Sequence, residues 1–373
     1  LACSEPIWAN SYGDASTDWP NSVAVDFQSN IVLAGFFQGA INFGPDAATT
    51  LVAAKEDDFF LAKFAPNGDH IWSKRFGDDT NELFPILAVD ASGNIYWSGL
   101  YKNLINLGGA PLTSTGNADF FVAKFAPDGS HLWSRTFGDN SSAWAKAIHT
   151  SPEGHVVVAG YFDVTIDFGS GSHTSAGGKD AFVAKLNGVD GSEVWSKTYG
   201  DDATQPPADQ EAVGMGIDNS GNIIVAGNFS TSMDVGPGGG YPLLTSDGGT
   251  DVFVFKVDQG GNRAWVTQFR GVDDEVVSSV DVDAAGSSAI VGTFAGTTTF
   301  EGADFIATTK TTTGSTDDDI FLVKLGPTGS HSWSKQFGDS ASQAVQLVIY
   351  NGAFDPSGDV VIAGGFGGTI DFG

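Results

Sequence analysis

The sequence is poor in cysteine, in basic residues and in long apolar runs. Its 373 residues include one cysteine, Cys3, so no disulfide can form within the chain. No apolar run approaches the roughly 18 residues of a membrane-spanning helix. Only 17 lysine and arginine residues stand against 45 acidic ones, and the resulting charge of −28 repels phosphate backbones and anionic lipids. These scarcities exclude nucleic acid as a partner class and predict no transmembrane segment.

Glycine and aromatic residues, by contrast, are abundant. There are 50 glycines, 28 phenylalanines and 9 tryptophans, while charged residues make up only 17% of the chain. This composition favours many short buried strands over long helices. The acidic surface indicates either a secreted protein that its charge keeps in solution or a surface that attracts divalent cations.

The N-terminus carries a candidate lipid anchor. The segment Leu1-Ala2-Cys3-Ser4 is similar to the end of a bacterial lipoprotein signal, in which the cysteine becomes the lipidated first residue. We therefore expect an extracytoplasmic protein, either secreted or held on the outer surface through Cys3.

A repeat runs along the whole chain, and its clearest mark is a tryptophan followed by a short polar strand and an aromatic-glycine pair, as in residues 72–78. Self-similarity at a fixed period is the signature of repeat architectures such as propellers. The marks follow one another at intervals of about 60 to 70 residues. They stand at Trp8, Trp72, Trp133, Trp195, Trp265 and Trp333.

Three further elements recur between the tryptophan marks in a fixed order. The first is a short apolar strand that ends in an Asp/Ser/Gly/Asn turn, as in residues 87–94, and such a turn closes a hairpin. The second, as in residues 94–99, is apolar on both faces, which indicates a sheet covered on both sides. The third reads Asp-x-Phe-apolar-x-Lys-apolar, as in residues 58–64. Its lysine is expected to be structural, with the stem packed between units and the ammonium paired at the rim.

Four short antiparallel strands per unit, repeated six times, predict an all-β fold. The expected architecture is a six-bladed β-propeller of four-stranded antiparallel blades, with residues 1–373 as a single domain because no break interrupts the period. Since the chain opens with an outer strand, the sixth blade is expected to be closed by the N- and C-terminal segments together.

The combined motif resembles a known repeat. The pattern Asp-x-x-Gly-Asn-apolar-x-apolar-x-Gly, followed by Asp-x-Phe-Val-Ala-Lys-Phe and then by Gly-x-x-x-Trp-Ser-Lys-x-Phe-Gly-Asp, is similar to the β-propeller repeat of bacterial secreted and surface proteins of the myxobacterial type. The resemblance spans nearly the whole chain. It implies a propeller fold and an extracytoplasmic location, and it implies no catalytic residues.

Acidic side chains are concentrated in the loops that precede the inner strands. In a propeller these loops ring the mouth of a central funnel, and converging carboxylates offer the oxygen ligands that Ca²⁺ prefers. Calcium is therefore a candidate cofactor, although a carboxylate after a glycine also serves simply to cap a turn. The candidate calcium ligands are Asp78, Asp79, Asp201, Asp202, Asp273 and Asp274.

Two tryptophans, Trp19 and Trp144, fall in one register near the predicted funnel mouth. Aromatic faces beside carboxylates hold sugars or extended peptides, although such a tryptophan also fills gaps between blades. Together with nearby acids they are the candidate ligand-binding residues: Trp19, Trp144, Asp18, Glu82 and Glu211.

These features favour a non-catalytic binding or scaffold propeller, whose ligand is a glycan, a peptide or a partner protein at the acidic, aromatic funnel face. We find no nucleophile-base-acid set and no phosphate-binding loop. Two alternatives stay open. One is a carbohydrate-active hydrolase or lyase, which would need two funnel carboxylates with divergent pKa values. The other is a subunit of an extracellular assembly.

The assembly alternative comes from counting strands. The chain has six tryptophan strands but only five Asp-x-Phe-x-x-Lys strands, so the sixth blade lacks its third strand before Gly373. Either the native chain continues into that strand, or the open slot recruits a strand from another molecule and allows self-association.

Overall fold

The computed structural model confirms an all-β chain. It describes residues 8–55, 57–77, 82–116, 118–138, 142–200, 208–236, 243–300, 308–311, 319–337, 348–355 and 358–365. Within these ranges there are thirty strands and one short 3-10 turn, Ala47–Thr49. Among the same residues no helix is long and apolar enough to cross a membrane.

Twenty strands form five antiparallel blades, which we number 1 to 5; four are four-stranded sheets, and the four strands of blade 4 belong to a six-stranded sheet. From the inner to the outer strand, blade 1 contains β1 (Asp18–Val25), β2 (Ile31–Phe37), β5 (Asp58–Phe64) and β6 (His70–Phe76). Blade 2 contains β7 (Leu83–Val89), β8 (Ile95–Tyr101), β11 (Asp119–Phe125) and β12 (His131–Phe137). Blade 3 contains β13 (Ala143–Thr150), β14 (Val156–Phe162), β17 (Asp180–Leu186) and β18 (Glu193–Tyr199). Blade 4 contains β19 (Gln210–Ile217), β20 (Ile223–Met233), β21 (Leu244–Val257) and β22 (Arg263–Gly271). Blade 5 contains β23 (Glu275–Val282), β24 (Ser288–Phe294), β27 (Asp319–Leu325) and β28 (His331–Phe337).

The remaining strands form short hairpins. Three of them lie between the second and third strands of blades 1 to 3: β3 (Ala40–Asn42) with β4 (Thr50–Val52), β9 (Leu104–Ile105) with β10 (Leu112–Thr113), and β15 (Thr165–Asp167) with β16 (Ser172–Thr174). The hairpin of β25 (Thr297–Phe300) and β26 (Thr308–Thr311) extends blade 4 by pairing with β22. The C-terminal hairpin consists of β29 (Val348–Phe354) and β30 (Val360–Gly365).

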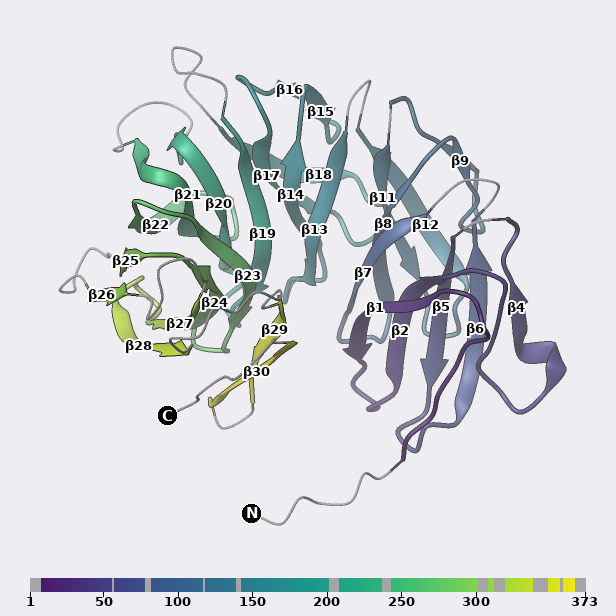
Figure 1. The fold of residues 1–373 in the computed structure, drawn as a ribbon. Coiled ribbons are helices and arrows are strands. Elements are labelled where there is room, and N and C mark those ends of the chain that lie inside the picture. The colour runs from purple at the N-terminus through teal and green to yellow at the C-terminus, as the bar shows by residue number, and fades with distance from the viewer. Residues whose placement is uncertain are drawn as a thin grey trace.

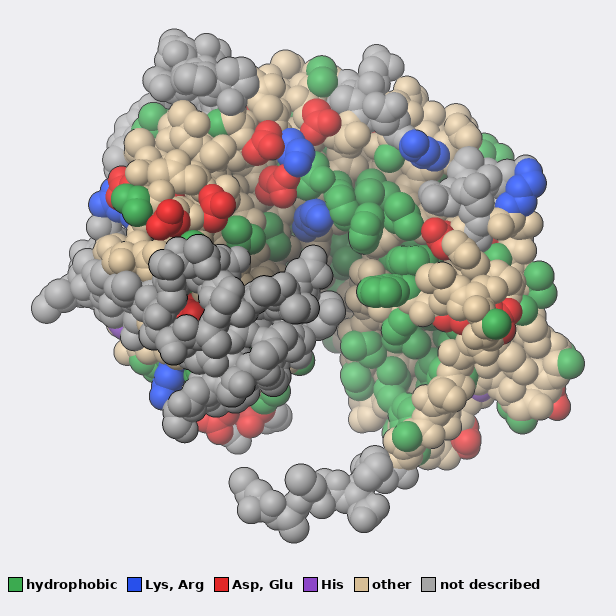
Figure 2. Space-filling view, in the orientation of Figure 1, with side chains coloured by type: hydrophobic (Ala, Val, Ile, Leu, Met, Phe, Trp, Pro, Cys, Tyr) green, Lys and Arg blue, Asp and Glu red, His purple; other side chains and the backbone are tan. Residues whose placement is uncertain are grey.

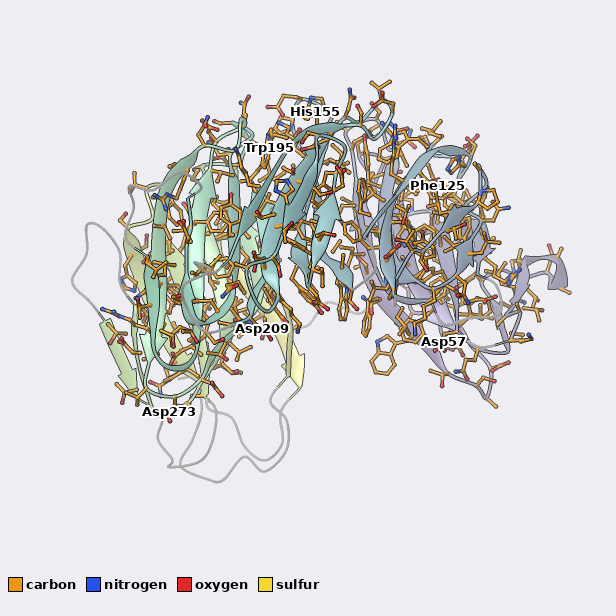
Figure 3. All side chains as sticks on the ribbon, turned by 90° about the horizontal axis from the view of Figure 1, so that it is seen from above. Asp57, Phe125, His155, Trp195, Asp209 and Asp273 are labelled. Atoms are coloured by element: carbon orange, nitrogen blue, oxygen red, sulfur yellow. The ribbon has the colours of Figure 1, made fainter. Side chains whose placement is uncertain are left out.

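The blades stand radially around a central channel (Figure 1). Their inner strands line a cavity of about 490 Å³, which is the channel of a propeller-type arrangement. Each inner strand begins at the same face of the ring. Figure 3 shows Asp57, Asp209 and Asp273, from loops of blades 1, 4 and 5, toward this face, and His155 toward the opposite one. We call the first face the funnel mouth.

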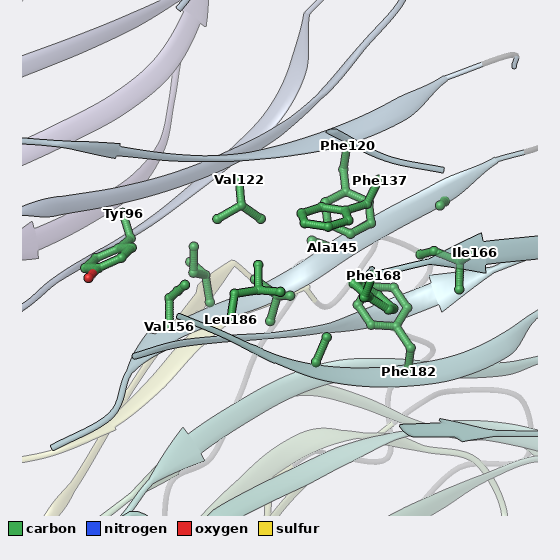
Figure 4. Packing of buried hydrophobic residues seen from close by; sticks show 14 of the residues in the cluster. Tyr96, Phe120, Val122, Phe137, Ala145, Val156, Ile166, Phe168, Phe182 and Leu186 are labelled. Atoms are coloured by element: carbon green, nitrogen blue, oxygen red, sulfur yellow. The ribbon is translucent and has the colours of Figure 1, made fainter. Parts of the chain in front are cut away.

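Neighbouring blades are held together by apolar contacts between whole sheets. At the junction of blades 2 and 3, the rings of Phe120 and Phe182 stack with centroids 5.6 Å apart, and Phe137 and Phe168 pack at 5.2 Å (Figure 4). The third strands are buried along their whole length in blades 1 and 3. A twisted sheet that is apolar on both faces needs a neighbour on each side, which is why the sequence shows continuous apolar runs.

The repeated lysine forms a clasp between consecutive blades. Lys63 Nζ lies 2.9 Å from Asp26 Oδ2 of its own blade and donates to the Pro127 carbonyl of the next blade at 3.2 Å. Trp72 Nε1 donates to the same Pro127 carbonyl at 3.1 Å. The equivalent clasps join Lys124 and Trp133 to Gly188, Lys185 and Trp195 to Gln259, and Lys256 and Trp265 to Pro327. The predicted structural role of the lysine is confirmed.

The predicted closure of a sixth blade is not formed among the described residues, which show five complete blades and the two-stranded C-terminal hairpin. The hairpin is tied to blade 5, because Gly352 N donates to Ser279 Oγ at 3.2 Å and Phe354 N donates to Asp281 Oδ2 at 2.6 Å. The N-terminal segment lies instead on blade 1, where Trp8 Nε1 donates to the Pro66 carbonyl at 2.9 Å. The two parts of the expected blade thus lie on opposite sides of a seam between blade 1 and the hairpin (Figure 1).

The seam leaves one inner strand uncovered. Val23 on β1 is 62% exposed, whereas the residues in the same register of the next four inner strands are 8% exposed or less. Those residues are Leu87, Ile148, Met215 and Val280. Like Val23, each of them pairs with the third residue of the second strand in its blade.

Candidate functional site

The funnel mouth is built by one register of the inner strands. Trp144 on β13 pairs with Tyr161, Trp19 on β1 pairs with Phe36, and Glu211 on β19 pairs with Asn228. Each of the three stands two residues before the unpaired residue of the bulge in its strand. Because side chains alternate along a strand, Trp144 and Lys146 flank a small residue, Ala145, that is buried. The sequence therefore places large polar and aromatic groups around the mouth.

Side chains of three adjacent blades meet at this mouth, and Figure 2 shows basic, acidic and apolar groups gathered around the central hollow. We call this group the mouth cluster. It consists of Phe84 from blade 2, Trp144, Lys146, Tyr161 and Lys179 from blade 3, and Glu211 from blade 4.

Three rings form the apolar part of the mouth cluster. The Phe84 and Trp144 centroids lie 4.4 Å apart, and those of Trp144 and Tyr161 lie 6.0 Å apart. Phe84 is 39% exposed and has a φ of 56°, a conformation that a bulky residue rarely adopts. Residues held in such strained backbone occur disproportionately at binding sites. Here the strained backbone places the Phe84 ring against Trp144.

Lys146 lies over these rings. Its Nζ is 3.3 Å from the centre of the Trp144 ring and 5.9 Å from that of Tyr161, so the ammonium makes cation–π contacts. Burial lowers the pKa of Lys146; the charge of Glu211 opposes this effect, and that of Lys179 adds to it. The side chain also lines the central channel.

Lys179 is held by carboxylates of the next blade. Its Nζ lies 2.5 Å from Glu211 Oε1 and 3.9 Å from Asp209 Oδ2, and it stands 4.7 Å from the centre of the Tyr161 ring. Burial opposes the charge of Lys179, but the bond to Glu211 outweighs it, so the pKa of this lysine is raised. For the Tyr161 hydroxyl, burial acts in the other direction and raises the pKa to about 12. Both groups therefore keep their protons at neutral pH.

Of the predicted ligand-binding residues, Trp144 and Glu211 lie in the mouth cluster, whereas Trp19 and Asp18 lie apart on blade 1. There they line a groove of about 380 Å³ together with Trp8 and Tyr12. The Trp19 ring is 54% exposed, and its ring neighbour is Phe36, with centroids 6.5 Å apart. Burial raises the pKa of Asp18, whose carboxylate accepts a bond from Asp14 N at 3.0 Å.

This groove is lined by the kind of residues that pack between blades elsewhere in the structure. Its lining includes Ile31, Leu33, Phe60 and Phe64. The residues in the same strand positions of blade 2 are Ile95, Trp97, Phe121 and Phe125, which are buried in the core cluster that joins blade 2 to blade 1. The groove on blade 1 therefore corresponds to the face with which blade 2 packs against the blade before it.

Glu82 does not face the mouth, contrary to the sequence prediction. It is fully buried at the junction of blades 1 and 2, and its carboxylate stands beside that of Asp58, both close to Gly77. The physical reason is its register: Glu82 precedes the first residue of β7 and points between the blades. A ligand in the funnel cannot reach it.

Only two of the six candidate calcium ligands, Asp273 and Asp274, lie within the described residues. Asp78, Asp79, Asp201 and Asp202 lie outside the described residues. Asp274 caps a neighbouring loop, because its Oδ1 accepts a bond from Thr250 N at 2.8 Å, and Asp273 precedes it in the same loop. In the described part of the chain, no three Asp, Glu, His or Cys side chains are grouped to hold a metal ion. Calcium binding stays a prediction.

One carboxylate pair has the raised pKa values that an acid–base mechanism would need. Burial raises the pKa of Glu275, and the charge of Asp251 raises it further; burial also raises that of Asp251. Both residues are fully buried between blades 4 and 5. The pair lies in the interior of this junction, away from the channel lining.

Sequence reasoning missed the two lysines, Tyr161 and Phe84. Lys146 could have been found, because it stands two residues after Trp144 and therefore shares its face of the strand. Tyr161, Phe84 and Lys179 come from other strands and loops, and their approach to Trp144 depends on the cross-strand register and on the angle between blades.

No protein-family model matches the chain. The chain is 20% identical, over 98% of its length, to an uncharacterized WD repeat-containing protein of Acanthamoeba polyphaga mimivirus. It spans about a third (31%) of the length of that curated relative. A WD-repeat relative agrees with the repeated four-stranded sheets described above.

Two solved structures are similar at low scores. Selenomethionine-substituted virginiamycin B lyase from Staphylococcus aureus has a TM-score of 0.38 and 8% identity, with 92% of this chain and 94% of that one covered. BamB from Moraxella catarrhalis has a TM-score of 0.27 and 10% identity, with 90% and 94% covered. Likenesses this distant carry no conclusion about activity, partners or location.

Proposed function

We propose that the chain is a non-catalytic binding propeller that holds a glycan at the mouth cluster. The observation that carries the proposal is the convergence of aromatic, cationic and carboxylate side chains from blades 2, 3 and 4 around Trp144, beside the central channel that Lys146 lines. Binding sites are concave, largely apolar and provided with a few placed polar groups.

The chemistry of the mouth cluster suits sugars better than a hydrophobic peptide. Carboxylates such as those of Glu211 and Asp209 accept hydrogen bonds from hydroxyl groups, and ammonium groups donate to ring and hydroxyl oxygens. The exposed part of the Phe84–Trp144 pair offers an apolar edge for the C–H face of a sugar ring. The two kinds of contact lie side by side, as the alternating polar and apolar surface of a pyranose requires.

Secretion or outer-surface anchoring, as implied by the bacterial repeat resemblance and by Cys3, would bring the mouth cluster to extracellular polysaccharide. Under this proposal the protein serves as a surface-exposed receptor or scaffold. The high negative charge would keep such a protein in solution outside the cell.

We further propose that the sixth blade closes in solution from the C-terminal hairpin and the N-terminal segment. Support comes from Trp8, whose bond to Pro66 repeats the tryptophan half of the clasp that each of blades 1 to 4 makes with its successor. The groove on blade 1 would then be covered by its own neighbour. Self-association through this seam is the alternative, and it predicts a concentration-dependent dimer.

A hydrolase or lyase is the competing function, and the raised pKa values of Asp251 and Glu275 are what favours it. Burial of both groups argues for a structural role, because general acids and bases must reach the substrate within hydrogen-bond distance.

The experiment that separates the two is a glycan array followed by a turnover screen on every glycan that binds. We expect binding without release of reducing ends or unsaturated products. Cleavage that is lost in Glu275→Gln but kept in Gln210→Glu, a change at the equivalent position of the preceding junction, would establish the enzyme instead.

A further inference from the structure

One ammonium group in the mouth cluster lacks an anionic partner in the described part of the chain. No carboxylate oxygen of these residues lies within 4.0 Å of Lys146 Nζ, and its closest recorded partner is the Trp144 ring at 3.3 Å. Lys179, the other lysine of the cluster, is already paired with Glu211 at 2.5 Å. Lys146 therefore stands in the channel wall with its capacity for hydrogen bonding to an anion unused.

We propose that Lys146 binds the carboxylate of a uronic acid, so that the ligand at the mouth cluster is an acidic glycan. This inference rests on the proposed function, because it names the class of glycan that the same site selects. A half-buried ammonium that has lost part of its hydration gains most from an ionised partner, since a charge-assisted bond is about twice as strong as a neutral one.

The surrounding charges favour a carboxylate over a phosphate or a sulfated chain. Glu211 and Asp209 stand on the other side of Lys179, and the whole chain carries a charge of −28. A dianionic phosphate or a dense run of sulfates would meet this repulsion at every group, whereas a single carboxylate per sugar places one charge at Lys146. The uncharged hydroxyls of the same sugar can donate to the nearby carboxylates.

The geometry also assigns a direction to the ligand. Lys146 lines the channel and lies over the Trp144 ring, and Lys179 of the same blade pairs with Glu211 of the next blade. The carboxylate would point into the channel, and the rest of the sugar would lie across Trp144 toward blade 4. An oligosaccharide can then leave the mouth without entering the narrow interior.

The test is isothermal titration with matched pairs of disaccharides that each carry a single uronic acid, galacturonic, glucuronic or mannuronic, each against its own methyl ester. Esterification removes the charge and keeps the ring. We expect at least one acid to bind about tenfold or more tightly than its ester, as the loss of one hydrogen bond to a charged group predicts.

Two variants locate the effect. Lys146→Gln should bring the affinity for the acid down to that for the ester, with the ester unchanged. The matched control is Lys197→Gln, which removes one positive charge from the outer strand of the same blade and should keep the full preference. Circular dichroism melting of all three proteins checks that each is folded.

The outcomes separate the inference from the proposed function. If neutral glycans bind in a Trp144-dependent manner and no acid binds better than its ester, the glycan site stands and the uronate inference is wrong. If the preference survives in Lys146→Gln, the inference is also wrong. If neither acids nor neutral glycans bind, both proposals fail together.

Discussion

Trp19 and Trp144 occupy the same register of two inner strands, and the structure gives them different surroundings. Trp144 is flanked by Phe84 of the preceding blade and by Tyr161, over which lies Lys179, the partner of Glu211 of the following blade. Trp19 stands beside an uncovered seam and contacts only Phe36 among aromatic rings of the described chain. A repeat thus supplies the same residue to several positions, but only neighbours on both sides turn that position into a site.

The largest expected contrast between the two regions is in core stability. Met215→Ala on the closed side removes a side chain that is 1% exposed and should cost about 2–5 kcal/mol. Val23→Ala in the same register at the seam should cost less than about 0.5 kcal/mol while the seam stays open, because the side chain is then 62% exposed, and more if the sixth blade closes as proposed above. Urea unfolding measures both. A cost above about 1 kcal/mol for Val23→Ala would mean that the seam is closed in solution.

The interblade clasps give the next contrast. Lys256→Met should cost about 3 kcal/mol, because it leaves the carboxylate of Asp218, whose side chain is 4% exposed, without its cation 3.0 Å away. Trp8→Phe at the seam removes one neutral hydrogen bond to Pro66 and should cost about 1 kcal/mol. Thermal melts of the two variants provide the comparison. Equal losses would show that the N-terminal segment is bound by more than the contacts seen here.

A smaller effect distinguishes two blade junctions by their pH dependence. Glu275 and Gln210 hold the same register at consecutive junctions, and burial, followed by the charge of Asp251, raises the pKa of Glu275 to about 9. The folded state therefore binds the proton more tightly than the unfolded one, and stability should fall as the pH rises from about 4.5 toward 9.

The control for this pH dependence is Glu275→Gln, which copies the neutral residue of the preceding junction. It should flatten the decline in melting temperature across that range, by at most the slope of one proton, about 1.4 kcal/mol per pH unit. A decline that is unchanged in Glu275→Gln would assign the titration to other groups.

The strand order and the lysine half of the clasps could be predicted from the sequence, because both follow from local patterns. The lysines that bind the next blade stand one residue before the end of the Asp-x-Phe-x-x-Lys strands. The turn after Asp90 closes as its composition predicts, with Asp90 Oδ1 accepting from Asn94 N at 2.9 Å. Burial of Glu82 and the approach of Phe84 to Trp144 depend on the angle between blades and on a backbone bulge. Neither the angle between blades nor the bulge can be read from the spacing of residues along a single strand.

The site itself was half predicted for the same reason. Trp144 follows from counting along its own strand, and Glu211 from the acidic residues expected before the inner strands, while Lys179 comes from the loop before β17 to pair with Glu211 and contact Tyr161. The counting that selected Trp144 also selected Trp19, because register alone carries no information about what covers each strand.

The most direct test of the account is therefore the paired affinity of Trp144→Ala and Trp19→Ala for a glycan that the unaltered protein binds, measured by isothermal titration. The account predicts a loss of about tenfold or more for Trp144→Ala, as expected for removing an aromatic anchor, and no change for Trp19→Ala. Loss of binding in Trp19→Ala with full affinity in Trp144→Ala would move the site to the groove on blade 1 and contradict the central claim.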